Sequence, residues 1–143
     1  MTAREFLDRP RMLQLEIDRK RRRISFLRSQ AGRMNAVLQE VRVQASPDPA
    51  RMQSLLAEAA DEEREIRLLE GQRQQAVVDT ILAISLLPDP RLVRVLEMRY
   101  LEEARWDMIA DELFCSVDWI YKLHRQALAS LPLPPGATEG PGS

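Results

Sequence analysis

The sequence predicts an all-α protein in which a long antiparallel helical hairpin precedes a compact unit of three short helices. Ala, Leu, Arg, Glu and Gln dominate the composition, which favours helices. Over two long stretches, apolar residues recur at steps of three, four or seven, the spacing of one helical face. After each stretch comes an Asp-Pro pair, Asp48-Pro49 and then Asp89-Pro90. In each pair the Asp can cap a new helix and the Pro can begin it.

The first long helix is expected to begin near Thr2, because Thr2 and Glu5 have the spacing of a capping box. Pro10 should kink or delay this helix, and it falls on the apolar face together with Lys20. The apolar face itself consists of Phe6, Leu13, Ile17, Ile24, Leu27, Ala31, Met34, Leu38 and Val41.

The second long helix carries a similar face, with polar gaps at Glu62 and Arg73. Because the connection between the two helices is short, they should form an antiparallel hairpin over residues 1–88. Each helix buries only one stripe, so the hairpin needs a third surface, either the C-terminal unit or a second chain. The predicted stripe is Met52, Leu55, Ala59, Ile66, Leu69, Val77, Ile81, Ile84 and Leu87.

Three short amphipathic helices are predicted over residues 89–131, and Ser116 should cap the last of them. Residues 132–143 are rich in Pro and Gly and have little to bury, so disorder is expected there. The expected inner faces are Leu92, Leu96 and Tyr100, then Ile109, Ala110 and Leu113, then Ile120, Leu123, Ala127, Leu128 and Leu131.

Residues 106–125 have the pattern of a helix-turn-helix, in which the second helix enters a DNA groove. We expect a recognition helix over about Ser116–Ser130, with Ser116 itself among the DNA-contact residues. On its outer face Asp118 can accept a hydrogen bond from cytosine, and Lys122 can donate one to guanine. Val117 can contact the methyl group of thymine. The expected phosphate contacts are Arg105, Arg125 and the Tyr121 hydroxyl. Trp119 lies near this face, where it can meet DNA, a neighbouring side chain or a partner.

Residues 99–131, RYLEEARWDMIADELFCSVDWIYKLHRQALASL, resemble region 4 of the sigma-70 family. They also resemble small phage and prophage regulators of the ArpU-like and RinA-like kinds. Such regulators carry a helical hairpin before the helix-turn-helix, so the resemblance covers about residues 2–131. It implies a DNA-binding transcriptional regulator, encoded by a phage or prophage, that acts on promoter DNA and RNA polymerase.

Two departures from the family pattern affect the turn and the cap. The family usually has Gly, Lys and Thr before its Trp, whereas this chain has Glu103, Ala104 and Arg105. A helix stop and a good cap are therefore expected to be lost. The family also usually has Gly where Phe114 stands. If Phe114 takes a left-handed conformation, the strain is roughly 1–2 kcal/mol.

The chain has a formal net charge of -1, so it is not a generic polyanion binder. Residues 1–33 nevertheless hold ten basic and four acidic side chains. Two interpretations of this cluster remain open. It is a phosphate patch that compensates for a weakly basic recognition helix, or it is a solvated face from which some arginines pair with acidic residues of the second helix. The cluster comprises Arg19, Lys20, Arg21, Arg22 and Arg23, with Arg28 nearby.

Several function classes are disfavoured. His124 is the only histidine and Cys115 the only cysteine, which predicts no metal site and no intramolecular disulfide. We expect His124 on a helix surface, Cys115 as an apolar turn residue and Trp106 as a core anchor. No Gly-rich phosphate loop or paired-carboxylate site is evident, so no enzyme, cofactor or small-molecule substrate is predicted. No membrane span or apolar signal core is evident, and the cytoplasm is the expected compartment.

Two function classes follow. The first is a DNA-binding transcriptional regulator whose partner is double-stranded DNA, with RNA polymerase as a second partner and homodimerisation through the hairpin. The alternative is a coiled-coil structural or interaction adaptor, small terminase-like or RNA polymerase-binding. In that alternative the helix-turn-helix is mainly a packing or docking module.

Overall fold

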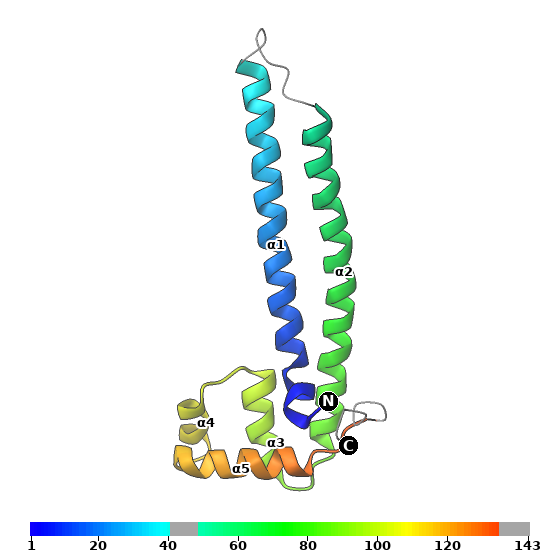
Figure 1. The fold of residues 1–143 in the computed structure, drawn as a ribbon. Coiled ribbons are helices and arrows are strands. Elements are labelled where there is room, and N and C mark those ends of the chain that lie inside the picture. The colour runs from blue at the N-terminus through cyan, green and yellow to red at the C-terminus, as the bar shows by residue number, and fades with distance from the viewer. Residues whose placement is uncertain (41–48, 135–143) are drawn as a thin grey trace. The chain divides into compact units, whose positions relative to one another are not determined.

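Figure 1 shows the computed structural model, which describes residues 1–40 and 49–134. Within these ranges every regular element is helical, so the predicted all-α class is confirmed. The long pair forms the expected antiparallel hairpin, and the short helices pack as a small unit after it. The helices are α1 (Ala3–Glu40), α2 (Pro49–Ser85), α3 (Pro90–Leu96), α4 (Trp106–Glu112) and α5 (Val117–Ser130), with a π-helical turn, η1 (Glu97–Leu101), directly after α3.

The chain divides into two compact units. Among the described residues, the hairpin unit consists of residues 13–40 and 49–72, and the trihelical unit combines residues 1–12 with residues 73–134. This grouping adds the first turns of α1 and the last turns of α2 to the predicted three-helix segment. No helix in the described ranges combines the length and apolar character needed to cross a bilayer.

The hairpin unit is held together by the predicted apolar seam. Ile17, Ile24 and Leu27 of α1 are buried against Ala59 and Ile66 of α2. These residues recur at steps of three, four or seven, so each helix turns the same narrow face toward its partner. The prediction for this part of both stripes is confirmed. Val41, at the end of the first stripe, lies outside the described residues, as does Asp48, the expected cap of α2.

The start of α1 follows the capping prediction. The backbone N–H of Glu5 donates to Oγ1 of Thr2 at 3.1 Å, which satisfies one amide of the first turn. Pro10 does not delay the helix, because α1 begins at Ala3 and continues through it. Pro10 is also buried, in agreement with its place on the apolar face.

Within the trihelical unit, α2 buries a slightly different stripe from the predicted one. Ile81 was expected in the core, and this prediction is wrong, because its side chain is 48% exposed. Ala76, Thr80 and Ala83 are buried in its place, in line with Leu87, which is buried as predicted. They are spaced by four, three and four, which maintains the heptad register. Thr80 fits this apolar seam because its hydroxyl donates to the carbonyl of Ala76 at 2.8 Å.

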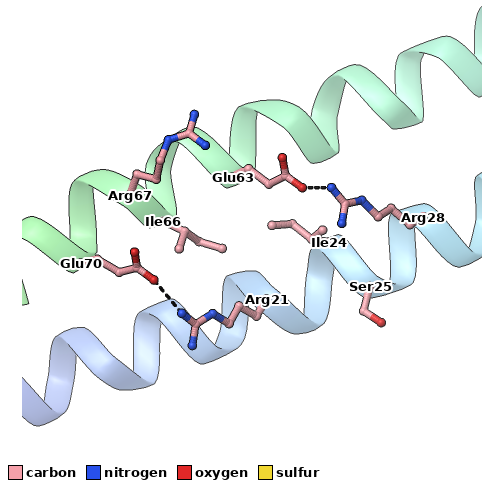
Figure 2. Close-up of a pocket in the computed structure, with 8 residues that line it drawn as sticks. All are labelled: Arg21, Ile24, Ser25, Arg28, Glu63, Ile66, Arg67 and Glu70. Carbon is pink, nitrogen blue, oxygen red and sulfur yellow. Dashed lines mark hydrogen bonds and ion pairs between the residues drawn. The ribbon is translucent and has the colours of Figure 1, made fainter.

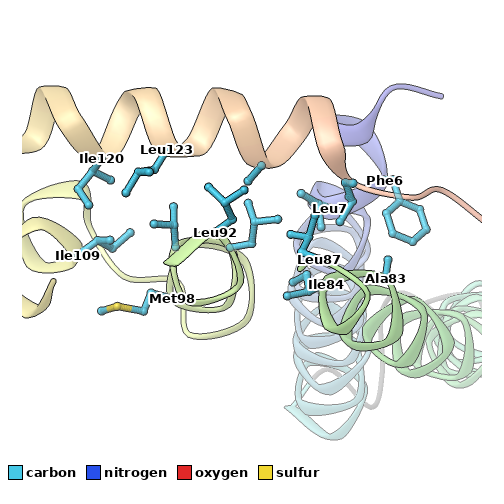
Figure 3. Close-up of a cluster of buried hydrophobic side chains, with 14 of the residues drawn as sticks. Phe6, Leu7, Ala83, Ile84, Leu87, Leu92, Met98, Ile109, Ile120 and Leu123 are labelled. Atoms are coloured by element: carbon cyan, nitrogen blue, oxygen red, sulfur yellow. The ribbon is translucent and has the colours of Figure 1, made fainter. Parts of the chain in front are cut away.

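The core of the trihelical unit joins residues from both ends of the chain. Figure 3 shows Phe6 and Leu7 of α1 beside the last turns of α2. The same cluster continues into α3, α4 and α5, which contribute apolar side chains in each predicted inner face. The short helices therefore do not form a closed core alone. The labelled members are Phe6, Leu7, Ala83, Ile84, Leu87, Leu92, Met98, Ile109, Ile120 and Leu123.

The Asp-Pro pair before α3 works as predicted. Oδ1 of Asp89 accepts the backbone N–H of Arg91 at 2.9 Å, and Pro90 is the first helical residue. The π-helical turn η1 was not predicted. It adds a residue to the helical turn, and so changes the direction of the side chains that follow α3.

Candidate nucleic-acid interface

A short turn joins α4 to α5, and its backbone closes the end of α4. The N–H of Cys115 donates to the carbonyl of Ala110 at 3.0 Å, and that of Phe114 to Asp111 at 3.3 Å. This pair of bonds is a Schellman motif, which requires a left-handed residue where Phe114 stands. Phe114 has a φ of 56°, so the conformation considered for it from sequence is the one it adopts.

Of the two losses expected from the departures before Trp106, the structure shows one and not the other. Glu103 has a φ of 55° just after η1, so it provides the helix stop although it is not glycine. The expected loss of the stop is therefore wrong. Arg105 occupies the N-cap of α4 and makes no capping bond with its side chain, which confirms the expected loss of a good cap. By contrast, Oγ of Ser116 accepts the N–H of Trp119 at 3.1 Å and caps α5 as predicted.

Replacing Phe114 with glycine is expected to stabilise the protein by about 1 kcal/mol, because glycine adopts a positive φ without strain. The ring is 96% exposed, so its removal loses no packing. Chemical denaturation of wild type and Phe114→Gly measures the difference. Phe114→Ala is the matched control, because it removes the ring and keeps Cβ, and it should change stability little. Equal stabilisation by both variants would assign the effect to the ring and not to the backbone.

The outward face of α5 carries most of the predicted DNA-contact residues. Asp118, Tyr121, Lys122 and Arg125 are all exposed. Within the described residues, no ion pair engages Lys122 or Arg125. Val117 was predicted to point away from the core, and this is wrong, because it is only partly exposed and packs against the core cluster.

Trp119 lies at the side of this face and is 42% exposed. Nζ of Lys122 lies 5.8 Å from its ring centroid, near the outer limit for a cation–π contact. The interaction is therefore weak and leaves the ammonium group able to bind other groups. Arg105 is exposed, and its Nε lies 3.5 Å from a carboxylate oxygen of Asp107.

The inner face of α5 contains one residue whose predicted position was wrong. His124 was expected on a helix surface, but it is only 7% exposed. Its Nε2 lies 2.7 Å from the hydroxyl of Tyr100 in η1. Burial lowers the pKa of His124 to about 4, and the positive charges of Arg4 and Arg99 act in the same direction. The ring is therefore neutral near pH 7, and its Nε2 can accept a hydrogen bond from the Tyr100 hydroxyl.

Trp106 completes an aromatic cluster beneath α5. Its ring meets His124 edge-on with centroids 4.8 Å apart, and Tyr121 with centroids 5.2 Å apart. The guanidinium of Arg99 lies 4.3 Å from the Trp106 ring centroid. Trp106 is partly buried against the core, so its prediction as an anchor is confirmed. The cluster ties the first residue of α4 to both η1 and α5.

The surface of η1 and α4 is acidic. Arg94 joins two of its carboxylates, at 2.6 Å from Glu102 and 3.0 Å from Glu112. The remaining acidic side chains leave this surface unfavourable for phosphate, since like charges repel. A DNA backbone would therefore meet the cations of α5 and Arg105 rather than the outer face of α4. The other exposed acidic residues are Glu103, Asp107 and Asp111.

In the hairpin unit, the basic cluster of α1 is largely paired with α2. Figure 2 shows the ion pairs of Arg21 with Glu70 and of Arg28 with Glu63. Nζ of Lys20 lies 3.0 Å from Glu62 and 2.5 Å from Glu65, and hydrogen bonds to these carboxylates raise its pKa. The remaining pairs are Arg23 with Glu58 and Glu62 of α2, and Arg19 with Glu16 and Arg21 with Asp18 within α1.

These contacts favour the second interpretation of the basic cluster. Within the described residues, ion pairs engage Arg19, Lys20, Arg21 and Arg23, and Arg22 is the one member of residues 19–23 for which none is found. The pairs are mostly exposed, so each contributes little to stability. They nevertheless place a carboxylate beside most of the cations and reduce the positive potential available to DNA.

A triple variant tests this interpretation. Arg21→Gln, Arg22→Gln and Arg23→Gln together should change the slope of log K for DNA against log salt by less than about 1, because at most one phosphate contact is lost. Fluorescence anisotropy titrations across a series of salt concentrations measure the slope. A phosphate-tracking patch predicts a loss of about 2 to 3 units, which would contradict the paired interpretation.

Tyr100 was predicted on an inner face, whereas the sequence patterns did not reveal Arg99 and His124 as the other residues that support α5 from below. The spacing of Ile120, His124 and Ala127 contained the signal for His124, since steps of four and three repeat one helical face. In the described ranges, no group of His, Cys, Asp and Glu is arranged to hold a metal ion. Comparison of the chain with protein-family models, curated proteins and solved structures found no match.

Proposed function

We propose that this protein is a sequence-specific DNA-binding transcriptional regulator in which α5 enters the major groove. One observation carries the proposal. A capped helix of 14 residues packs by its inner face, and its outward face presents Asp118, Lys122 and Arg125 to solvent. A rigid helix whose early residues project outward has the geometry with which helix-turn-helix proteins reach base edges.

Each outward residue has a role in this proposal. Asp118 lies in the first turn of α5 and accepts a hydrogen bond from a cytosine amino group. Lys122 lies one turn later and donates to guanine, or to a phosphate at the edge of the groove. Arg125 and Arg105 contact phosphates, and the Tyr121 hydroxyl adds a further donor. Trp119 borders the same face and packs against the sugar-phosphate backbone.

The resemblance to sigma-70 region 4 and to small phage regulators supports the transcriptional part of the proposal. On that basis the protein acts in the cytoplasm, on phage or prophage promoters, and contacts RNA polymerase. Few cations face the DNA, so binding depends on base contacts and groove shape more than on phosphate neutralisation. We therefore expect a small salt dependence for a protein of this class.

The proposal is tested with DNA selected from a random pool by the full chain. Lys122→Ala and Arg125→Ala should each weaken binding to the selected duplex roughly tenfold, since each removes a charge-assisted contact. Arg64→Ala is the matched control, because Arg64 is an exposed arginine of the hairpin unit paired with Asp61. It should bind like wild type. Weak binding that is equal in all four proteins would contradict the proposal.

A second candidate is an adaptor whose helix-turn-helix docks on a protein. The observation in its favour is Phe114, a 96% exposed ring held at the turn beside an acidic helix. Strained and exposed residues often mark functional contacts. Light scattering separates the two candidates, because a ring-like assembly of many copies supports the adaptor. A monomer or dimer that binds the selected DNA supports the regulator.

A further inference from the structure

The last turns of α2 present a second apolar face in the trihelical unit. Val78, Ile81 and Leu82 of α2 are joined by Leu86, which lies in the turn just past the end of the helix. These residues follow one another at steps of three, one and four, so they lie on one side of this segment. They are 39%, 48%, 59% and 68% exposed, respectively. The opposite side of the same turns already fills the core. This second face therefore does not contribute to the core of the unit.

The face continues into a shallow groove beside the end of α5. Leu82 and Leu86 line it with Pro132, Leu133 and Pro134, and its volume is about 260 Å³. Asp79 is the only charged residue in residues 74–88, and its carboxylate accepts from Nε2 of Gln75 at 2.9 Å. The four exposed side chains leave on the order of 400 Å² of apolar surface in water, a size that often marks a binding site.

We propose that this face, Val78, Ile81, Leu82 and Leu86, binds the same face of a second copy of the chain. An antiparallel pairing centred on Leu82 brings Val78 of one copy against Leu86 of the other, so the larger side chain meets the smaller. The same pairing sets Asp79 opposite Ser85, so the only charged residue of the segment does not meet itself. A face with so little charge does not repel its own copy, and isologous pairing is the commonest form of dimer.

Two further observations favour a second copy as the occupant. Residues 135–143 contain no Val, Leu, Ile, Met or aromatic residue, so they offer no large apolar side chain to cover the face. Two copies bury on the order of 800 Å² from the four side chains, and the neighbouring groove brings the total near the lower limit for specific interfaces. We therefore expect a weak dimer, with a dissociation constant on the order of 10 µM.

Sedimentation velocity of the full chain over about 1 to 200 µM tests the proposal without DNA, so it fails or succeeds independently of the proposed function. Wild type should shift from monomer to dimer. Leu82→Glu should remain a monomer with an unchanged circular dichroism spectrum. Leu68→Glu is the matched control, because Leu68 is 64% exposed on α2 within the hairpin unit, and it should dimerise like wild type. A monomeric wild type, a dimeric Leu82→Glu or a monomeric Leu68→Glu would each overturn the proposal.

A crosslinking experiment decides the case in which Leu82→Glu fails to fold. In a Cys115→Ser background, Leu82→Cys places a single thiol at the centre of the pairing, where the two copies approach most closely. Mild oxidation should then give a disulfide-linked dimer, whereas Leu68→Cys in the same background should give little. Equal crosslinking of both variants, or none at Leu82→Cys, would overturn the pairing.

Discussion

Acidification from about pH 6.5 to about pH 4 is expected to lower the free energy of unfolding by about 3 kcal/mol through His124 alone. The pKa of His124 is about 4 in the folded protein, below its ordinary value of 6.5, mainly because the ring is buried. Between these values the unfolded chain binds a proton that the folded chain does not. The contribution is fully present above about pH 6.5 and is lost progressively as pH falls toward 4.

The consequence for α5 follows from what His124 contacts. Protonation removes the acceptor for the Tyr100 hydroxyl and places a charge beside Arg4 and Arg99. Both effects weaken the attachment of α5 to η1. Loosening of α5 is therefore expected before the whole protein unfolds, and the proposed DNA binding should decline over the same pH range.

Chemical denaturation at several pH values measures the effect, and His124→Gln is the control. Glutamine does not titrate, so the difference in stability between wild type and variant should shrink by about 3 kcal/mol as pH falls to about 4. Groups other than His124 contribute equally to both proteins and cancel. Curves that stay parallel from pH 7 to about 4 would show that His124 titrates normally and is not buried as described.

Trp106→Ala is expected to lower the free energy of unfolding by roughly 3 kcal/mol, because it removes the ring that joins α4, η1 and α5. The ring contacts His124, Tyr121 and Arg99, and it packs against the core. Its loss leaves a cavity beneath α5 and exposes His124 to water. The variant should therefore also raise the pKa of His124 toward its ordinary value, which NMR titration measures.

Trp119→Ala is the matched control for this substitution. The two residues are chemically identical, but Trp119 is 42% exposed and belongs to the outer face of α5. Its removal should lower stability by less than about 1 kcal/mol and leave the pKa of His124 unchanged. Equal losses from the two tryptophan substitutions would contradict the assignment of Trp106 to the interior.

Much of the fold follows from local rules that the sequence displays. The caps at Thr2, Asp89 and Ser116 depend on side chains within three residues of the amides they satisfy, so spacing alone predicts them. The hairpin seam follows from helical periodicity over many turns. The left-handed backbone at Phe114 was considered because the regulators that this segment resembles usually have glycine at that position.

Other features depend on register and on contacts distant in sequence. The pairing of Lys20 with Glu62 and Glu65 requires the offset between α1 and α2, which local patterns do not specify. Ile81 was placed in the core because it is aliphatic. The heptad spacing instead places Thr80 in the core, where its hydroxyl donates a hydrogen bond to the Ala76 carbonyl of the same helix. His124 was predicted on the surface because its side chain is polar, although its helical spacing from Ile120 and Ala127 places it on the buried face.

The central claim is that the outward face of α5 reads base pairs, and DNA selection with Asp118→Asn tests it most directly. Asparagine replaces a carboxylate acceptor with an amide of the same shape, so folding should be preserved while the preferred base changes from cytosine toward adenine. Selection from a random pool by wild type and variant should give two motifs that differ at one base-pair position. Identical motifs, or no enriched sequence with wild type, would contradict the claim.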